Sequence, residues 1–212
     1  MRYQCEASTV DGFVQQLAVA YLTHGYWFYS LGSVPEQKDP KRIDAKLIEK
    51  YGMDISRASR CRRKRGGLAN VHYLRYDRFF VLLATHGQHL FFEEEGEKVK
   101  DARRAPIKFH GYSVGYNQGH ARVAIEREVY QGLKAELLEL AARCSRKELE
   151  AAFWNMPWEP YAPIRTQILT LLRQVNKKRE TAGLEPLQRS CLRLYRKQCR
   201  PFELASPVVL AA

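Results

Sequence analysis

The sequence contains no long hydrophobic segment and no recognisable export signal. Among its 212 residues there is no run of about 18 apolar residues, the length that a helix needs to span a bilayer. The N-terminus also lacks the charged head and apolar stretch of a secretory signal. We therefore expect a soluble protein of the cytoplasm that has no membrane partner.

Cysteine is sparse, and its spacing matches neither a disulfide framework nor a zinc site. The five cysteines are odd in number and scattered along the chain, at Cys5, Cys61, Cys144, Cys191 and Cys199. No two of them have the close spacing that zinc-binding loops use. We expect reduced thiols, no metal ion and no cofactor.

Negative charge is scarce. The chain has 35 Lys and Arg residues against 23 Asp and Glu residues, which gives a formal net charge of +12 at pH 7. Such an excess is typical of proteins that bind the phosphates of nucleic acids. An anionic membrane surface and an acidic protein are the other partners that it would suit. The hydrophobic fraction of 45% favours a packed core over disorder.

Two stretches contain cations but no carboxylate. The first, between Ser56 and Arg65, holds six: Arg57, Arg60, Arg62, Arg63, Lys64 and Arg65. The second lies between Gln188 and Arg200 and holds Arg189, Arg193, Arg196, Lys197 and Arg200. It is either an edge strand with one basic face or an extended arm that lies on nucleic acid. Because nothing local neutralises these charges, both stretches predict a polyanionic partner.

The first basic stretch follows a short helical pattern. Asp39 caps a helix that Pro40 can begin, and Gly52 ends it. Ser56 can cap a second helix, in which the small residues Ala58 and Cys61 are the expected inner face.

Residues 44–63 therefore resemble a helix-turn-helix unit. The resemblance implies that the second helix lies in the major groove of DNA. On this hypothesis the side chains that meet bases or phosphates are Ser56, Arg57, Ser59, Arg60 and Arg63.

Aromatic residues accompany both basic stretches. Tyr73, Tyr76 and Tyr195 could stack on unpaired bases, although ordinary strand packing is the favoured explanation for Tyr73. The residues that we predict to contact nucleic acid are Arg57, Arg60, Arg62, Arg63, Lys64, Arg65, Tyr73, Arg75, Tyr76, Arg189, Arg193, Arg196 and Lys197.

No catalytic residue can be assigned. His86, His89 and Glu93 resemble a metal-ligand set, but their spacing suits neither a strand nor a helical zinc motif. The His-x-His pair of metal-dependent, tyrosine-based strand transfer is absent. Metal-free RNA cleavage by histidine and arginine stays open, with His72, His86, His89, His110 and His120 as the histidines that it would draw on.

The pattern predicts an α+β fold, with a small antiparallel sheet, flanking helices and a helical C-terminal region. Besides the helices at Asp39 and Ser56, we expect helices from the Ser8-x-x-Asp11 capping box, from Tyr130, from the Ser145-x-x-Glu148 capping box and from Ile164. The expected strands are Tyr26–Leu31, a hairpin over Val71–Leu83 that turns at Tyr76-Asp77-Arg78, Gln88–Glu93, and a hairpin over Ile107–Ile125 that turns at Asn117-Gln118-Gly119.

We expect residues 1–155 to form an α+β nucleic-acid-binding domain. Residues 156–212 are expected to form a helical extension with a basic arm, packed on the same core. The predicted function is nucleic-acid binding, with DNA slightly ahead of RNA. The alternatives are an enzyme acting on nucleic acid, either a nuclease or a strand-transfer protein, and a basic docking protein for an acidic protein or ribonucleoprotein.

Overall fold

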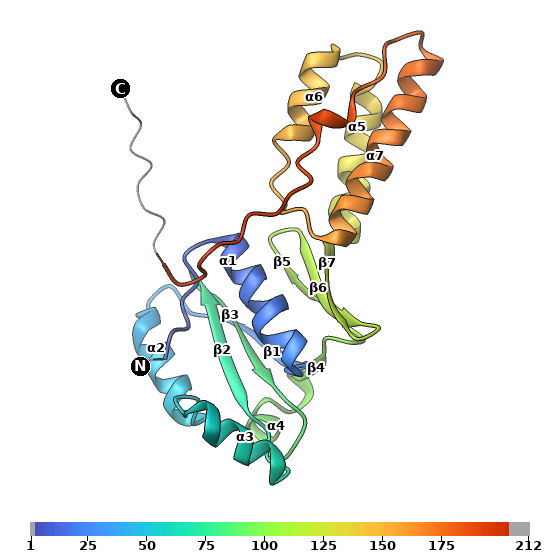
Figure 1. Ribbon diagram of the computed structural model, residues 1–212. Coiled ribbons are helices and arrows are strands. Elements are labelled where there is room, and N and C mark those ends of the chain that lie inside the picture. Colours follow the sequence, from blue (N-terminus) through green and yellow to red (C-terminus); the bar gives the residue numbers. More distant parts are fainter. Residues whose placement is uncertain (1–2, 204–212) are drawn as a thin grey trace. The chain divides into compact units, whose positions relative to one another are not determined.

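The computed structural model describes residues 3–203, which form two compact units (Figure 1). The first unit contains residues 3–106, 115–121 and 199–203, and the second contains residues 107–114 and 122–198. The predicted division into domains after residue 155 stays a prediction. Within residues 3–203, no helix combines the length and the apolar character that a bilayer crossing needs.

The first unit is built on a four-stranded antiparallel sheet. Its strands are β1 (Phe28–Ser33), β2 (Val71–Tyr76), β3 (Phe79–Ala84) and β4 (Lys100–Asp101), in the order β2-β3-β1-β4. Asp77 takes the positive φ of +50° that the tight β2–β3 turn requires, so the predicted hairpin is confirmed. With helices beside this sheet, the predicted α+β class is also confirmed.

Helical segments pack against both faces of the sheet. One face carries α1 (Val10–Gln15), which continues through a π-helical turn (Gln16–Tyr21) and a 3-10 turn (Leu22–His24); Tyr21 there stacks on His72 of β2. Tyr73, the next residue of β2, points to the other face, because successive side chains of a strand alternate. That face packs against α2 (Pro40–Lys50) and α4 (Leu90–Glu95).

Two details of these helices differ from the prediction. The N-cap of α1 is Thr9 rather than Ser8, and its hydroxyl accepts from the amide of Gly12 at 3.0 Å. The predicted strand Gln88–Glu93 is wrong, because a helix forms there. His89 caps α4 by accepting from the amide of Phe91 at 3.0 Å, and Phe91 is fully buried in the core.

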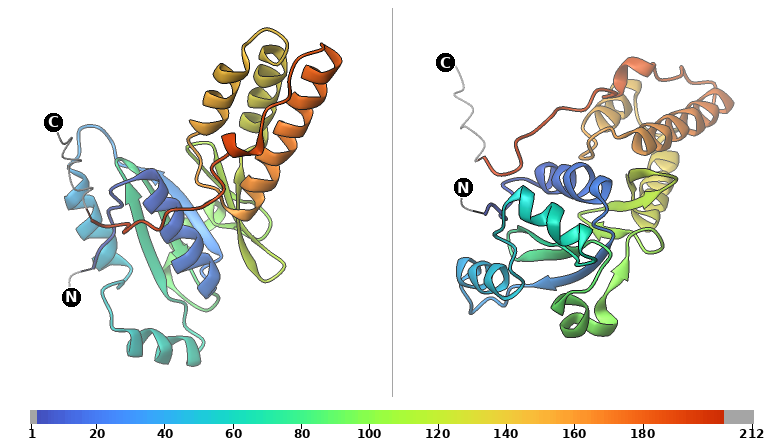
Figure 2. Two further views of the ribbon diagram at one scale, coloured as in Figure 1. Left: turned by 45° about the horizontal axis from the view of Figure 1, so that its top comes forward. Right: turned by 60° about the horizontal axis from the view of Figure 1, so that its bottom comes forward.

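The helix that carries the first basic stretch is α3 (Arg57–Arg65). Asp39 and Ser56 cap α2 and α3 as predicted, each accepting a backbone amide. Gly52, at φ +56°, lies in the turn between these helices. Figure 2 shows α3 beside the sheet in two further views.

The second unit combines a small sheet with a helical region. Its elements are β5 (Ile107–Phe109), β6 (Tyr112–Asn117), β7 (His120–Ile125), α5 (Arg127–Leu140), α6 (Arg146–Trp154), α7 (Ala162–Thr181) and a 3-10 turn (Arg189–Cys191), and the unit boundaries fall within β6 and β7. The turn at Asn117-Gln118-Gly119 is confirmed. The expected continuous strand Ile107–Tyr116 is instead broken, because His110 and Gly111 take positive φ angles.

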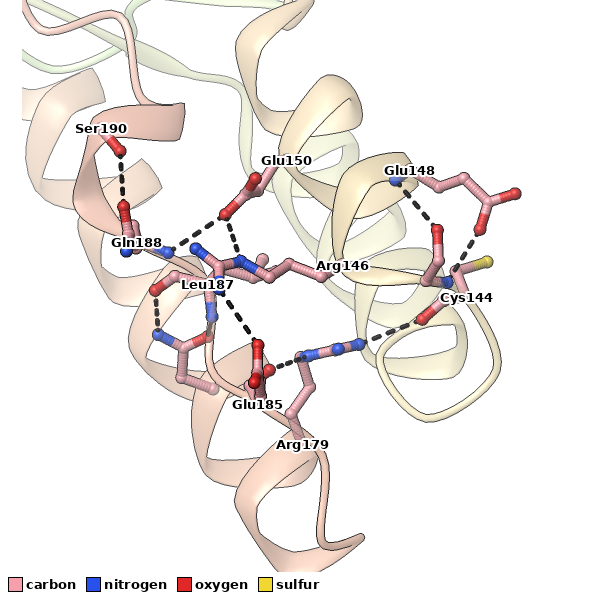
Figure 3. A network of polar contacts seen from close by, with 11 residues as sticks. Cys144, Arg146, Glu148, Glu150, Arg179, Glu185, Leu187, Gln188 and Ser190 are labelled. Carbon is pink, nitrogen blue, oxygen red and sulfur yellow. Dashed lines mark hydrogen bonds and ion pairs between the residues drawn. The ribbon is translucent and has the colours of Figure 1, made fainter.

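A buried arginine joins the helices of the second unit (Figure 3). Arg179 lies in the last turn of α7, where a cation suits the helix dipole. Arg179 is only 3% exposed, and it donates to the carbonyls of Ala141, Cys144 and Glu185 at 2.9, 3.1 and 2.7 Å. Its role is to satisfy carbonyls at the end of α5 and in the chain after α7.

Candidate nucleic-acid interface

Local sequence explains why a helix so rich in like charges forms at α3. The Ser56 hydroxyl accepts from the amide of Ser59 at 3.1 Å, which satisfies one free donor of the first turn. Arginine and lysine are good helix formers, and the cations in the last turn meet the negative end of the helix dipole. Gly67, at φ +74°, follows the end of the helix.

The outer face of α3 is cationic. Arg57, Arg62, Lys64 and Arg65 are exposed, and we call these four residues the outer cations. Ala58 and Cys61 share this exposure, so the prediction that they form the inner face is wrong. The helix instead turns Ser59, Arg60 and Arg63 partly inward.

The outer cations form no ion pair within the described part of the chain. Among residues 3–203, no carboxylate lies within the 4.0 Å ion-pair distance of any of them. One weak side-chain hydrogen bond, from Arg62 to the Ser59 hydroxyl at 3.5 Å, involves this set. Their charge is therefore directed to solvent and available to an anionic ligand.

The two inner arginines have a different environment. Arg60 donates to the carbonyl of Met53 at 3.3 Å, and the carbonyl of Arg60 accepts from the Asn70 side chain at 3.0 Å. The Nε atoms of Arg60 and Arg63 are buried, without a hydrogen-bond partner in the described part of the chain. Three of the five predicted base-reading residues, Ser59, Arg60 and Arg63, are therefore partly covered, whereas Ser56 and Arg57 are exposed.

Two predicted contact residues, Tyr73 and Arg75, lie inside the protein. Tyr73 is 0% exposed and donates to Asp44 at 2.7 Å; Arg75 is 2% exposed and donates to both oxygens of Asp44 at 2.8 Å. The strand turns both side chains toward α2, where nucleic acid has no access. Their predicted role is thereby corrected, while Tyr76 at the end of β2 remains half-buried.

The second basic stretch belongs to the second unit up to Gln198, and it is a separate candidate surface. It forms a 3-10 turn and then irregular chain, so the edge-strand alternative is wrong, while an arm that lies on nucleic acid stays a prediction. Arg189 and Lys197 are exposed, whereas Arg193 donates to the carbonyl of Met156. Arg196 lies 4.8 Å from the centre of the Tyr161 ring and donates to its hydroxyl at 3.1 Å.

His72, one of the five histidines considered for RNA cleavage, lies within a cluster of tyrosines. His72 is enclosed by Tyr21 and Tyr26, whose ring centres lie 4.7 and 4.8 Å away, and its Nδ1 is 2.8 Å from the Tyr3 hydroxyl. Burial, with a smaller contribution from the Arg60 charge, lowers the pKa of His72 to about 3. Sequence reasoning missed this cluster, because aromatic spacing alone does not show which residues enclose a histidine.

His86, His89 and Glu93, which resemble a metal-ligand set in the sequence, are not placed so that they could hold a metal ion. His89 uses Nδ1 to cap α4, and burial followed by the charge of Arg63 lowers its pKa. Across residues 3–203, no three His, Cys, Asp or Glu side chains are placed so that they could hold a metal ion.

A groove of about 810 Å³ lies between the N-terminal segment and α2. Its lining includes Glu6, Glu49 and Asp54, with Lys41 as a cation. Carboxylates repel phosphates, so this groove does not suit a nucleic-acid backbone. The outer cations of α3 suit the charge of a phosphate better than this groove does.

Comparison with known proteins gave no assignment. No protein-family model matches the sequence, and a search of curated proteins found no match.

Proposed function

We propose that this protein binds nucleic acid through the outer face of α3. The observation that carries the proposal is the display of Arg57, Arg62, Lys64 and Arg65 on one helix, with no carboxylate of residues 3–203 at ion-pair distance. A helix of nine residues is about 13 Å long. The same length of duplex carries about four phosphates per strand, so the charge spacing suits a nucleic-acid backbone.

The proposal slightly favours DNA over RNA as the ligand, because α2, the Gly52 turn and α3 follow one another as in a helix-turn-helix unit. The side chains that would enter the groove are the exposed ones of α3, with Arg62 and Arg65 in place of the partly covered Arg60 and Arg63. A location in the reducing cytoplasm belongs to the same proposal and agrees with the free thiols of all five cysteines.

Fluorescence anisotropy with labelled duplex DNA, single-stranded DNA, duplex RNA and hairpin RNA, each titrated with salt, tests the proposal. The variant Arg57→Ala/Arg62→Ala/Lys64→Ala/Arg65→Ala should bind more weakly and with a flatter salt dependence than the wild type. Each phosphate contact contributes about 0.9 to the slope of log K against log salt on duplex DNA, so the slope should fall by up to about 3.6.

A matched control removes four exposed cations from around α2 of the same unit, in the variant Lys38→Ala/Lys41→Ala/Arg42→Ala/Lys46→Ala. The control changes the net charge by the same amount. A loss of affinity in the α3 variant that the control does not show therefore supports α3 as the contact surface. Equally weakened binding in the two variants would show that the loss of affinity reflects net charge alone. If the wild type binds none of the oligonucleotides at moderate salt, the docking-protein alternative is favoured. If an oligonucleotide is cut or becomes covalently attached to the protein, the enzyme alternative is favoured.

A further inference from the structure

The aromatic side chain of Tyr195 is displayed in solvent. It is 93% exposed, and no aromatic ring among residues 3–203 contacts it. By contrast, Tyr73 is fully buried and Tyr76 half-buried. Of the three tyrosines beside the basic stretches, Tyr195 alone offers an open ring face in the described part of the chain.

The backbone on either side of Tyr195 is anchored by hydrogen bonds. The carbonyl of Leu194 accepts from Arg165 at 3.4 Å, and the amide of Lys197 donates to the carboxylate of Glu159 at 3.0 Å. Both partners come from the second unit, so these contacts hold the segment on its own unit.

Two neighbouring side chains reinforce this anchoring. Arg193 donates to the carbonyl of Met156, and Arg196 lies over the ring of Tyr161 and donates to its hydroxyl. A ring on an anchored segment loses less conformational freedom on binding than one on a loose arm. The tyrosine side chain itself adds little further loss of conformational entropy on binding, because it has only two rotatable χ angles.

Exposed cations accompany the ring. Arg165, which donates to the residue before Tyr195, is exposed, and so is Lys197 two residues after it. Glu159 is the nearby carboxylate, and it is held by the Lys197 amide. An aromatic face accompanied by exposed cations is the combination that binds a nucleobase together with its phosphates.

We infer that Tyr195 stacks on an unpaired nucleobase and that the segment around it binds single-stranded nucleic acid. In a duplex both faces of each internal base are already stacked, so a projecting ring finds a partner where the strand is unpaired. Since every base has a π face, the inference covers single-stranded DNA and single-stranded RNA. It rests on the proposed function and adds a separate surface, on the second unit, that binds an unpaired strand.

The test compares the full-length wild type with Tyr195→Ala, Tyr195→Leu and Tyr195→Phe. Each is titrated by anisotropy with a single-stranded DNA, a single-stranded RNA, a matched duplex and an abasic oligonucleotide of equal length. Loss of one stacked base costs about 1–3 kcal/mol, so Tyr195→Ala should weaken single-strand binding by about 5- to 150-fold. Tyr195→Leu should behave like Tyr195→Ala, and Tyr195→Phe like the wild type.

Duplex and abasic binding should be the same for all four proteins, because these ligands offer no free base face. Equal affinity of Tyr195→Ala and wild type for both single strands would overturn the inference, and so would an equal loss on the abasic oligonucleotide. The proposed function fails separately, when the wild type binds none of the four ligands. A loss confined to the DNA or the RNA strand supports the inference and identifies the natural ligand class.

Discussion

Arg75 of β2 and Asp44 of α2 form a buried two-point ion pair. The Nε and Nη2 atoms of Arg75 each lie 2.8 Å from a carboxylate oxygen of Asp44, and Tyr73 donates to the same carboxylate at 2.7 Å. Burial of these groups is possible because every strong donor and acceptor has a partner. The pair joins a helix of the first unit to its sheet.

Removal of the carboxylate should therefore destabilise the first unit. Asp44→Ala leaves the Arg75 charge buried, with Glu6 at 3.2 Å as its remaining acidic partner. Breaking a buried pair in this way costs about 3–5 kcal/mol, which urea denaturation monitored by circular dichroism would measure. Glu6→Gln is the control, because Glu6 is largely exposed, and it should change the free energy of unfolding by less than about 1 kcal/mol. Equal effects of the two substitutions would contradict the assigned role of Asp44.

In the second unit, Arg179→Ala should be far more damaging than Lys178→Ala. The first change leaves the carbonyls of Ala141, Cys144 and Glu185 without their shared donor. Hydrogen bonds from a charged group contribute about 1.5–3 kcal/mol each, so a total loss of about 3 kcal/mol or more is expected in thermal or urea unfolding. Lys178 is exposed, and its loss should stay within about 0.5 kcal/mol. Similar stability of the two variants would show that the buried contacts contribute little.

The burial of Arg75 and Arg179 could not be predicted from the sequence. Arg75 and Arg179 look like surface cations in the sequence, because charged residues are seldom fully buried. What buries them is the partner that the fold supplies, a carboxylate from α2 for Arg75 and helix-terminal carbonyls for Arg179. The one sequence signal for the first pair is that Asp44 follows the apolar Ile43 within α2, and nothing in the sequence indicates the second.

Most signals that act within a few residues were read correctly, although the N-cap of α1 is Thr9 and not the predicted Ser8. Asp39, Ser56 and Ser145 cap the helices that follow them, and Asp77 and Gln118 occupy positive φ at the predicted turns. Each depends on a contact between neighbours in the chain, which the sequence specifies directly.

Tertiary packing decided the features that sequence missed. The run around Phe91 has strand-like composition, but the His89 cap and the burial of Phe91 in the core make it helical. In α3, packing turned Arg60 inward and left Cys61 outside. The residue types of the proposed interface could thus be predicted, whereas the face of the helix could not.

Acid should destabilise the first unit partly through His72. Its pKa is about 3 in the folded protein and about 6.5 in an unfolded chain, so between these values the unfolded state binds more protons. The contribution of His72 to folding is therefore complete above about pH 6.5 and falls as the pH drops toward 3, by at most about 1.4 kcal/mol per pH unit. The variant His72→Gln, which can still bond to Tyr3, should show a shallower decline in stability from pH 7 to pH 4 when urea unfolding is measured. Parallel curves for the two proteins would mean that other groups cause the acid sensitivity.

Substitutions on the outer and the inner face of α3 should differ in their effect on the salt dependence of DNA binding. Arg62→Ala/Arg65→Ala removes two outer cations and should lower the slope of log K against log salt on duplex DNA by about 1.8, with little change in the free energy of unfolding. Arg60→Ala/Arg63→Ala removes the same charge from the partly buried face, where the side chains cover the interior. That variant should alter stability more and the salt slope less. Because net charge is equal in both, a larger slope change in the inner pair would place the phosphate contacts on the wrong face of the helix and overturn the proposed interface.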